Sequence, residues 1–297
     1  MQILHIWDQA GVACIFAKYQ KKMGHSVKVL RKANYDPYGI YEFYRDSINF
    51  IEDSIFLDMC VKESKEADII HIHSRTDVLF HLREKLNKKC KIIMHFHGSE
   101  LRGIMERNER LSLSSIPLFF KNYRISYLRK TKNEMAERLS DKVLISTPDL
   151  AKYITKRDYI FLHNPVDTEH FSYKHNKNEI NSGETFFTFN TEAISDIEWI
   201  KDFCKRNGVN NLQIVDRRKN PIMYSDMPSF LRKFQVYVDV RYINYKVLEN
   251  LSKTALESLS CGLKVLDYNL KYRQGLPREH DPYNVINRLE TVYKQIM

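Results

Sequence analysis

Short apolar runs alternate with segments of helical periodicity along most of the chain, and few folds accommodate this pattern. The runs Ile3–Trp7, Ala67–Ile72 and Lys91–Phe96 have the length and the apolar content of buried strands. Each is followed by a segment in which apolar residues recur every three or four positions. Strands that are apolar on both faces and joined by helices are typical of parallel sheets. The pattern predicts an α/β fold built from doubly wound parallel sheets.

The alternation runs through the chain twice. The first series ends at Tyr159–Leu162, and the second begins at Thr185–Phe189 after a polar stretch. A chain of 297 residues is long enough for two domains of ordinary size. We therefore predict a Rossmann-like N-terminal domain at residues 1–165, a Rossmann-like second domain at residues 166–280, and a C-terminal helix at residues 281–297 that could pack back toward the first domain.

Two local patterns add detail to this organisation. The apolar residues between Ile48 and Met59 recur with helical spacing, so we expect a helix there. The segment Ser252–Cys261 has the same periodicity, and Gly262 follows it at the position where helices commonly end. The second helix is important because it begins beside a cluster of polar residues.

Glycine motifs that bind phosphate are missing from the sequence. The 9 glycines are dispersed, and none of them forms Gly-x-Gly-x-x-Gly. Gly98 and Gly103 have the spacing of a P-loop, but Ile104 and Met105 stand where that motif has Lys and Ser or Thr. No Asp-x-Asp occurs either, which excludes the commonest short carboxylate pair for a metal–diphosphate site.

Histidine and cysteine are the candidate metal ligands in this sequence. His71 with His73, and His95 with His97, form two His-x-His pairs near strand ends. Three interpretations stay open for them, namely packing, direct contact with a ligand, and metal binding. Because no acidic or cysteine ligand has suitable spacing, no metal is predicted. The five cysteines form no Cys-x2-Cys pair, as expected for thiols in a reducing cytosol.

The chain is basic, with a formal net charge of +10 and a pI of about 9.2. Such a surface favours an anionic partner: nucleic acid, anionic lipid or a phosphorylated small molecule. Residues 102–132 contribute +6 of this charge, interleaved with aromatic residues. This segment is typical of a peripheral membrane surface that would suit a lipid-linked acceptor, although a solvated helix face is an alternative. Nucleic acid is the least expected partner, because no recognised module accompanies the charge. The predicted membrane or acceptor surface comprises Arg124, Arg129, Lys130 and Lys132.

Localisation is predicted from what the sequence lacks. The N-terminus has no basic leader, so we expect no signal peptide. The charge-free run Leu111–Phe120 is half as long as a membrane-spanning helix requires. The protein is expected in the cytoplasm, with peripheral attachment at the inner face of the membrane as an alternative.

A pair of glutamates flanks the start of the helix predicted from Ser252. Glu249 precedes the helix, and Glu257 lies within its first turns. Backbone N–H groups at a helix start favour phosphate oxygens, and a carboxylate can accept two hydrogen bonds from a ribose diol. The arrangement predicts a site for a sugar nucleotide.

The order and spacing of several segments resemble the retaining glycosyltransferases of family 4, which have the GT-B fold, over most of the chain. The segments include residues 67–73, 97–101, 140–146 and 163–171, and the Glu-x7-Glu stretch that continues to Gly262. The resemblance implies two Rossmann-like domains that face a central cleft. The N-terminal domain would bind the acceptor, and the C-terminal domain would bind a nucleoside diphosphate sugar.

The resemblance also implies roles for single residues. Glu257 would hold the ribose hydroxyls, and Glu249 would contact the donor sugar as a catalytic residue. His97, the second catalytic candidate, would reach the sugar from the N-terminal domain. Gly11 would let the first loop approach the diphosphate. The amides of Asn250, Leu251, Ser252 and Lys253 would face sugar or phosphate.

The sequence departs from the family at two positions that bear on donor binding. Asn250-Leu251-Ser252 replaces the usual Gly-Phe-Gly. Asn190-Thr191-Glu192 stands where the family has Arg and Lys, so the positive charge near the diphosphate must come from elsewhere. The candidates are Arg217, Arg218, Lys219, Arg241 and Lys253.

The predicted function is transfer of a sugar, with retention and without a metal or other cofactor, from a nucleoside diphosphate donor to a glycan or lipid-linked acceptor. The donor is of the UDP or GDP type, and the sequence does not specify the base. The first alternative is a non-catalytic protein of the same fold that binds a sugar nucleotide or a glycolipid. A nucleic-acid binder is the second alternative.

Overall fold

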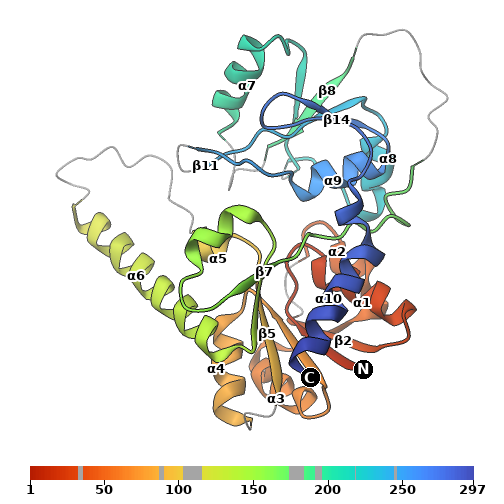
Figure 1. Cartoon of the computed structure of the whole chain (residues 1–297). Helices are drawn as coiled ribbons and strands as arrows, with labels where there is room; N and C mark the ends of the chain where they lie inside the picture. The colour runs from red at the N-terminus through yellow and green to blue at the C-terminus, as the bar shows by residue number, and fades with distance from the viewer. Residues whose placement is uncertain are drawn as a thin grey trace. The chain divides into compact units, whose positions relative to one another are not determined.

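The chain forms two compact units in the computed structural model (Figure 1). The first comprises Met1–Tyr35, Arg45–His163 and Ile286–Met297, and the second comprises Asp36–Tyr44 and Asn164–Val285. The structure describes residues 1–32, 36–86, 90–102, 116–173, 184–190, 196–217, 219–243 and 246–297, with the backbone alone at 116–124 and 243. Within these ranges, no helix is long and apolar enough to cross a membrane.

The first unit is a doubly wound parallel sheet, which confirms the predicted fold class. Its strand order is β3-β2-β1-β4-β5-β6-β7, so the chain winds outward from β1 and then returns to the other side of it. The strands are β1 (Gln2–Ile6), β2 (Ser26–Lys32), β3 (Ile48–Ile51), β4 (Ile69–His73), β5 (Lys91–Phe96), β6 (Lys142–Ile145) and β7 (Tyr159–Phe161). Every neighbouring pair in this sheet is parallel.

Helices cover both faces of this sheet. They are α1 (Val12–Lys22), α3 (Phe56–Ser64), α4 (Thr76–Lys85), α5 (Ser99–Arg102), α6 (Ile116–Leu139) and, from its fifth residue, α10 (Pro282–Ile296). The short 3-10 helices are η1 (Arg45–Ser47), η2 (Asp53–Ile55) and η4 (Pro148–Tyr153). Figure 1 shows α10 beside α1, and the Tyr293 hydroxyl of α10 accepts a hydrogen bond of 3.3 Å from the Gln20 side chain of α1.

The two faces of the sheet differ in chemistry, because successive residues of a strand point to opposite sides. On β4, Ile70 and Ile72 join a hydrocarbon core with residues of α3, α4 and α6. His71 and His73 alternate with them and lie on the face that carries Tyr293. One face is therefore packed with aliphatic side chains, whereas the other carries buried histidines.

The structure corrects the helix expected between Ile48 and Met59. Residues Ile48–Ile51 form the edge strand β3, paired with β2, and the helix begins only at Phe56. A spacing of three residues between Ile48 and Ile51 fits one helical turn, but the run is too short to exclude a strand. The β-branched Ile48 is buried in its strand position.

The second unit contains a smaller sheet in the order β14-β13-β10-β8-β9. Its strands are β8 (Phe186–Phe189), β9 (Leu212–Val215), β10 (Val236–Val238), β13 (Lys264–Leu266) and β14 (Tyr272–Arg273), with β11 (Tyr242–Ile243) and β12 (Lys246–Val247) in a separate hairpin. All pairs in the sheet are parallel except β13 with β14. Its helices are α2 (Ile40–Phe43), α7 (Ile197–Arg206), α8 (Met227–Leu231) and α9 (Lys253–Ser260), with η5 (Tyr224–Asp226) and η6 (Arg278–His280).

The units divide the chain differently from the predicted boundaries at 165 and 280. The segment Asp36–Tyr44 belongs to the second unit, where the Tyr224 amide donates to the Tyr38 carbonyl at 2.7 Å. The Tyr44 hydroxyl also donates to the buried Asp167 carboxylate at 2.8 Å. A boundary drawn at one point in the sequence cannot capture a segment that returns by tertiary contacts.

Candidate functional site

The candidate site of the second unit lies at the carboxyl ends of β8 and β10. These neighbouring strands are where the winding of the sheet reverses, which is the usual position for a ligand in such sheets. Asp239 directly follows β10 and is buried. Its Oδ2 accepts a hydrogen bond of 2.7 Å from the backbone N–H of Ser252, at the start of α9. Asp239 thus fastens the start of that helix to the sheet edge.

Helix α9 begins with a side-chain cap. The Ser252 Oγ accepts a hydrogen bond of 3.0 Å from the Ala255 amide, which satisfies one of the N–H groups that a helix start leaves without an intrahelical partner. The partial positive charge at this end of the helix favours an anion. Lys253 adds a full positive charge at the first helical position.

Glu257 lies one turn further along α9 and is 6% exposed. Its Oε1 is 3.6 Å from the Lys253 Nζ, the i,i+4 pairing of a helix face. Burial raises the pKa of Glu257, while the charges of Lys253 and Arg217 act in the opposite direction. The result is a buried carboxylate beside two cations, at the edge of the sheet where a ligand would bind.

Arg217 approaches Glu257 from the loop after β9. Its guanidinium carbon lies 3.9 Å from the centre of the Tyr38 ring, and its Nη2 donates to the Ile222 carbonyl at 2.9 Å. Burial lowers the pKa of Arg217. Stacking on Tyr38 orients the guanidinium, and its charge acts to lower the pKa of Glu257. Of the predicted cations that the structure describes, Lys253 and Arg217 are the two whose charges act on the pKa of Glu257. Arg218 lies outside the described residues.

Arg241 has a different environment from Arg217. Its Nη2 donates to the backbone carbonyl and to the side-chain oxygen of Asn250, the latter at 2.6 Å. Its Nε lies 3.4 Å from Asp239. Arg241 and Asn250 therefore brace the loop that leads into α9. In the same loop, Leu251 is half-buried and Glu249 is exposed.

Three residues of this region were missed by the sequence analysis: Tyr38, Tyr224 and Asp239. The Lys253 ammonium lies 5.6 Å from the centre of the Tyr224 ring. Asp239 could have been found, because an acidic residue after an apolar strand reads as a residue of the sheet edge. Tyr38 carried no such signal, since it lies far from Arg217 in the sequence.

In the first unit, Gly11 stands before α1 with φ of 84°, a conformation that glycine adopts at no steric cost. Its amide donates to the Asp8 carboxylate at 2.5 Å, and the Ala13 amide donates to the same carboxylate at 2.6 Å. Asp8 is 1% exposed. The N-terminus of α1 therefore already holds an anion that belongs to the protein.

The four histidines of the two His-x-His pairs lie together in the first unit, and the structure adds a fifth, His5. Its partner in the register between β1 and β4 is His71. His97 is half-buried, and its ring nitrogens contact His73 Nδ1 at 2.9 Å and Ser146 Oγ at 2.7 Å. Two triads, His5-His71-His73 and His73-His95-His97, have ring nitrogens within 4.8 Å of one another. Packing among themselves, one of the three interpretations above, accounts for these contacts.

The predicted basic surface lies on α6. Lys130 and Lys132 are exposed, and Arg129 is half-buried. Exposed apolar residues accompany them: Ile125, Tyr127, Leu128 and Met135. The side chain of Arg124 lies outside the described residues.

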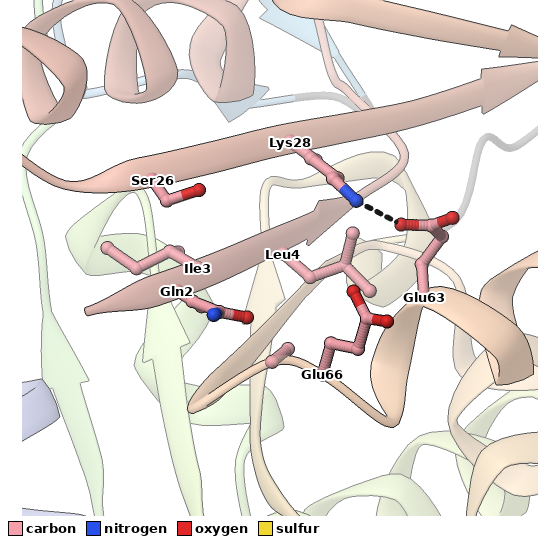
Figure 2. Close-up of a pocket in the computed structure, with 8 residues that line it drawn as sticks. Gln2, Ile3, Leu4, Ser26, Lys28, Glu63 and Glu66 are labelled. Carbon is pink, nitrogen blue, oxygen red and sulfur yellow. Dashed lines mark hydrogen bonds and ion pairs between the residues drawn. The ribbon is translucent and has the colours of Figure 1, made fainter.

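A hollow in the first unit lies away from the sheet edge considered above. Figure 2 shows it beside the amino ends of β1 and β2, with Gln2 and Ser26 on its rim. Lys28 and Glu63 close one side of it through an ion pair of 2.6 Å. Ligands of parallel sheets bind at the carboxyl ends, so this hollow is not the candidate site.

Comparison with known proteins identifies the fold. No protein-family model matches the sequence, and no curated protein matches it. Among solved structures, the chain is similar to an α-glucosyltransferase in complex with UDP and a 13-mer DNA containing an HMU base, with a TM-score of 0.59 at 13% identity. That match covers 100% of this chain and 92% of the other. The same enzyme with UDP gives a TM-score of 0.57 at 12% identity, covering 100% of this chain and 90% of the other.

A third structure, of α-glucosyltransferase with UDP-glucose and DNA containing an abasic site, matches with a TM-score of 0.55 at 13% identity. It covers 99% of this chain and 91% of the other. Since these similarities extend over both parallel-sheet units, the chain has the GT-B fold.

Proposed function

We propose that this protein is a glycosyltransferase that transfers a sugar from a nucleoside diphosphate sugar, with UDP as the nucleotide. The observation that carries the proposal is the buried Glu257 with Lys253 and Arg217 beside it, at the carboxyl edge of the second sheet. A carboxylate suits a ribose diol, and two cations suit a diphosphate. UDP is chosen because the similar α-glucosyltransferase structures contain UDP or UDP-glucose.

The chemistry assigned to this site is electrostatic. As the bond between sugar and diphosphate breaks, negative charge develops on the leaving diphosphate. Lys253, Arg217 and the start of α9 stabilise that charge in place of a metal ion. The transfer proceeds with retention of the anomeric configuration, and it requires no strong side-chain nucleophile.

Further roles are assigned to residues that lie outside this cluster. The exposed Glu249 contacts the donor sugar. His97 of the first unit contacts the same sugar with its partly exposed ring. Arg241 and Asn250 act through the loop geometry, since Arg241 donates to Asn250 and forms an ion pair with Asp239.

The acceptor is a hydroxyl group, and two sources of it are considered. A glycan or a lipid-linked acceptor fits the basic and apolar residues of α6. DNA is the second, because four of the similar α-glucosyltransferase structures contain it. The expectation that nucleic acid is a poor partner has no support in these comparisons, and the net charge of +10 suits a polyanion.

The test is calorimetric titration of the whole chain with UDP, GDP and ADP. We expect binding of UDP, a loss of affinity of about 100-fold in Glu257→Gln, and no loss in Glu198→Gln, whose carboxylate is exposed on α7. Glu249→Gln should bind UDP normally but transfer no sugar. Equal UDP affinity in Glu257→Gln and in the unmodified protein would refute the assigned donor site.

Turnover separates the enzyme from a binding protein of the same fold. UDP-glucose is incubated with the protein and with glycan, lipid-linked or DNA acceptors, and released UDP is measured. UDP binding without acceptor-dependent release would favour the non-catalytic alternative.

A further inference from the structure

Eight side chains of the first unit form a closed ring of hydrogen bonds on the histidine face of the sheet. Five are histidines from β1, β4 and the end of β5, and the others are Gln20 of α1, Tyr293 of α10 and Ser146 after β6. The bonds are Gln20–His5 at 2.8 Å, His5–His73 at 3.1 Å, His73–His97 at 2.9 Å, His97–Ser146 at 2.7 Å, Ser146–His95 at 3.0 Å, His95–His71 at 3.1 Å, His71–Tyr293 at 2.9 Å and Tyr293–Gln20 at 3.3 Å.

The amide of Gln20 determines the direction of every bond in this ring. Its oxygen faces the Nε2 of His5, so that nitrogen must carry a proton. A neutral imidazole has one donor and one acceptor nitrogen, so His5 Nδ1 then accepts from His73 Nε2. The same argument makes His97 donate through Nε2 to His73 and accept at Nδ1 from the Ser146 hydroxyl.

The other half of the ring follows without conflict. Ser146 has given its proton to His97, so it accepts from Nε2 of His95. His95 then accepts at Nδ1 from Nε2 of His71, which in turn accepts at Nδ1 from the Tyr293 hydroxyl. The Gln20 amide nitrogen donates to Tyr293 and closes the ring.

The proton count of the ring is complete. Eight bonds are made by eight protons, one from each side chain, and no member carries a charge. Apart from His97, each ring member is at most 3% exposed. Burial lowers the pKa of His5 to about 4 and the pKa values of His71, His73 and His95 well below the usual value, as expected for neutral imidazoles.

The same geometry argues against a metal among these residues. The His71 and His73 rings are stacked, with centroids 4.4 Å apart and planes 13° apart. Lone pairs of stacked rings do not converge on one point, as the ligands of a zinc ion must. The ring nitrogens instead face one another at hydrogen-bond distances.

We propose that these eight side chains act as one proton-ordered ring in which Gln20 is a positioning residue. Through the ring, Gln20 holds all five histidines as neutral Nε2–H tautomers, including His97 at the sheet edge. His97 therefore meets a ligand as a neutral imidazole. Its tautomer depends, through the ring, on Gln20, which lies 77 positions earlier in the chain. Only the contact of His97 with a sugar rests on the proposed function.

The decisive variant is Gln20→Glu, which nearly preserves shape and changes the proton count. A carboxylate brings two acceptors and no proton, so seven protons remain for eight bonds. We expect the ring to take up one proton and to hold one imidazolium at pH 7.5. Nitrogen NMR of the whole chain labelled with 15N-histidine measures this directly, because imidazole nitrogens with and without a proton differ in chemical shift.

The unmodified protein, in which the signals of the five ring histidines are assigned among the 11 histidines of the chain, is measured first and should show these five neutral and protonated at Nε2. A charged histidine, an Nδ1–H tautomer or a mixture among these five would overturn the proposal. So would a bound metal at one equivalent in the purified protein. These measurements do not depend on whether Gln20→Glu folds, and they need no nucleotide, so they stand if donor binding fails.

Tyr293→Phe provides an independent opening of the ring. It removes the proton that His71 accepts, so His71 can adopt the Nδ1–H tautomer. The hydrogen bonds of the ring then no longer all run in one direction. We expect mixed tautomers in this variant, and unchanged spectra in Tyr283→Phe, whose ring is exposed on the same helix. Unchanged tautomers in Tyr293→Phe would contradict the role of the closed ring.

Discussion

The carboxyl edges of the two sheets satisfy their polar groups in opposite ways. In the first unit, the eight side chains of the histidine ring are neutral and bond to one another, and the Asp8 carboxylate accepts hydrogen bonds from the amides at the start of α1. In the second unit, a buried carboxylate and two cations surround the start of α9. In the first unit every hydrogen bond of the ring is made within the protein, so its geometry does not depend on a ligand. In the second unit a bound anion would be stabilised by the cations and the start of α9. The two edges should therefore respond differently to pH, mutation and nucleotide.

Acid should have the largest effect, and it should act on the first unit. Histidine in an unfolded chain has a pKa of about 6.5, whereas burial lowers the pKa of folded His5 to about 4. Between these values the unfolded chain binds more protons, so stability falls as the pH falls below 6.5. His5 alone accounts for a loss on the order of 3 kcal/mol, and His71, His73 and His95 act in the same direction.

The chain offers one tryptophan in each unit to measure this. Trp7 lies in the first unit and Trp199 in the second, so Trp199→Phe and Trp7→Phe each leave one reporter. Urea unfolding at pH 7.5 and pH 5 should show a larger loss of stability through Trp7. The second unit has His280, whose pKa burial also lowers, so a smaller loss is expected through Trp199. Equal losses would remove the contrast between the units.

Loss of a cation should affect the second unit and leave the first unchanged. Lys253→Met removes the ammonium 3.6 Å from Glu257 and the charge at the start of α9. UDP affinity should fall about 30-fold, or roughly 2 kcal/mol, as measured by calorimetry. Lys201→Met, on an exposed face of α7, is the matched control. Unchanged UDP affinity in Lys253→Met would show that the charge of Lys253 does not contribute to nucleotide binding at the start of α9.

Removal of the Tyr293 hydroxyl should distinguish the closed ring of hydrogen bonds from an ordinary exposed contact. Tyr293→Phe leaves His71 and Gln20 each without one buried hydrogen-bond partner, at a cost of about 1–3 kcal/mol in the unfolding free energy reported by Trp7. Tyr272→Phe removes an exposed hydroxyl that donates to Glu184 and should cost less than about 0.5 kcal/mol. Similar costs for the two variants would count against the ring as a unit.

The smallest effect should come from the helix cap. Ser252→Ala removes the oxygen that accepts from the Ala255 amide and should lower the stability reported by Trp199 by about 1 kcal/mol. Ser252→Gly should cost less, because glycine is tolerated at this position. If both variants cost the same, the effect comes from the loop and not from the hydrogen bond.

Much of the fold was predictable because strand and helix periodicities are local. The boundaries of β1, β5 and α10 lie within two residues of the apolar patterns. One exception is β3, a strand so short that its spacing also fits a helix. The two-residue strands β11, β12 and β14 were not predicted either. The assignment of Asp36–Tyr44 to the second unit depends on contacts with Tyr224 and Asp167, which no local pattern encodes.

The candidate site was predictable in part, for the same reason. Glu257 and Lys253 share one helix, so their spacing places them on one face. The sequence does not show that Arg217, and not Arg241, acts on Glu257. That difference arises because Arg217 stacks on Tyr38, whereas Arg241 donates to Asn250. The His-x-His spacing placed pairs of histidines on a common face, but Gln20 and Tyr293, which close the ring, are 273 positions apart.

That separation has a consequence for how the protein is made on the ribosome. The whole of Asn164–Val285 is synthesised after the first unit's sheet and before Tyr293. Until α10 emerges, His71 and Gln20 lack their shared partner Tyr293. The histidine face of the nascent sheet therefore stays uncovered by α10 during this time. The first half of the chain should therefore remain a client for chaperones during synthesis, and it should mature only when the second half is complete.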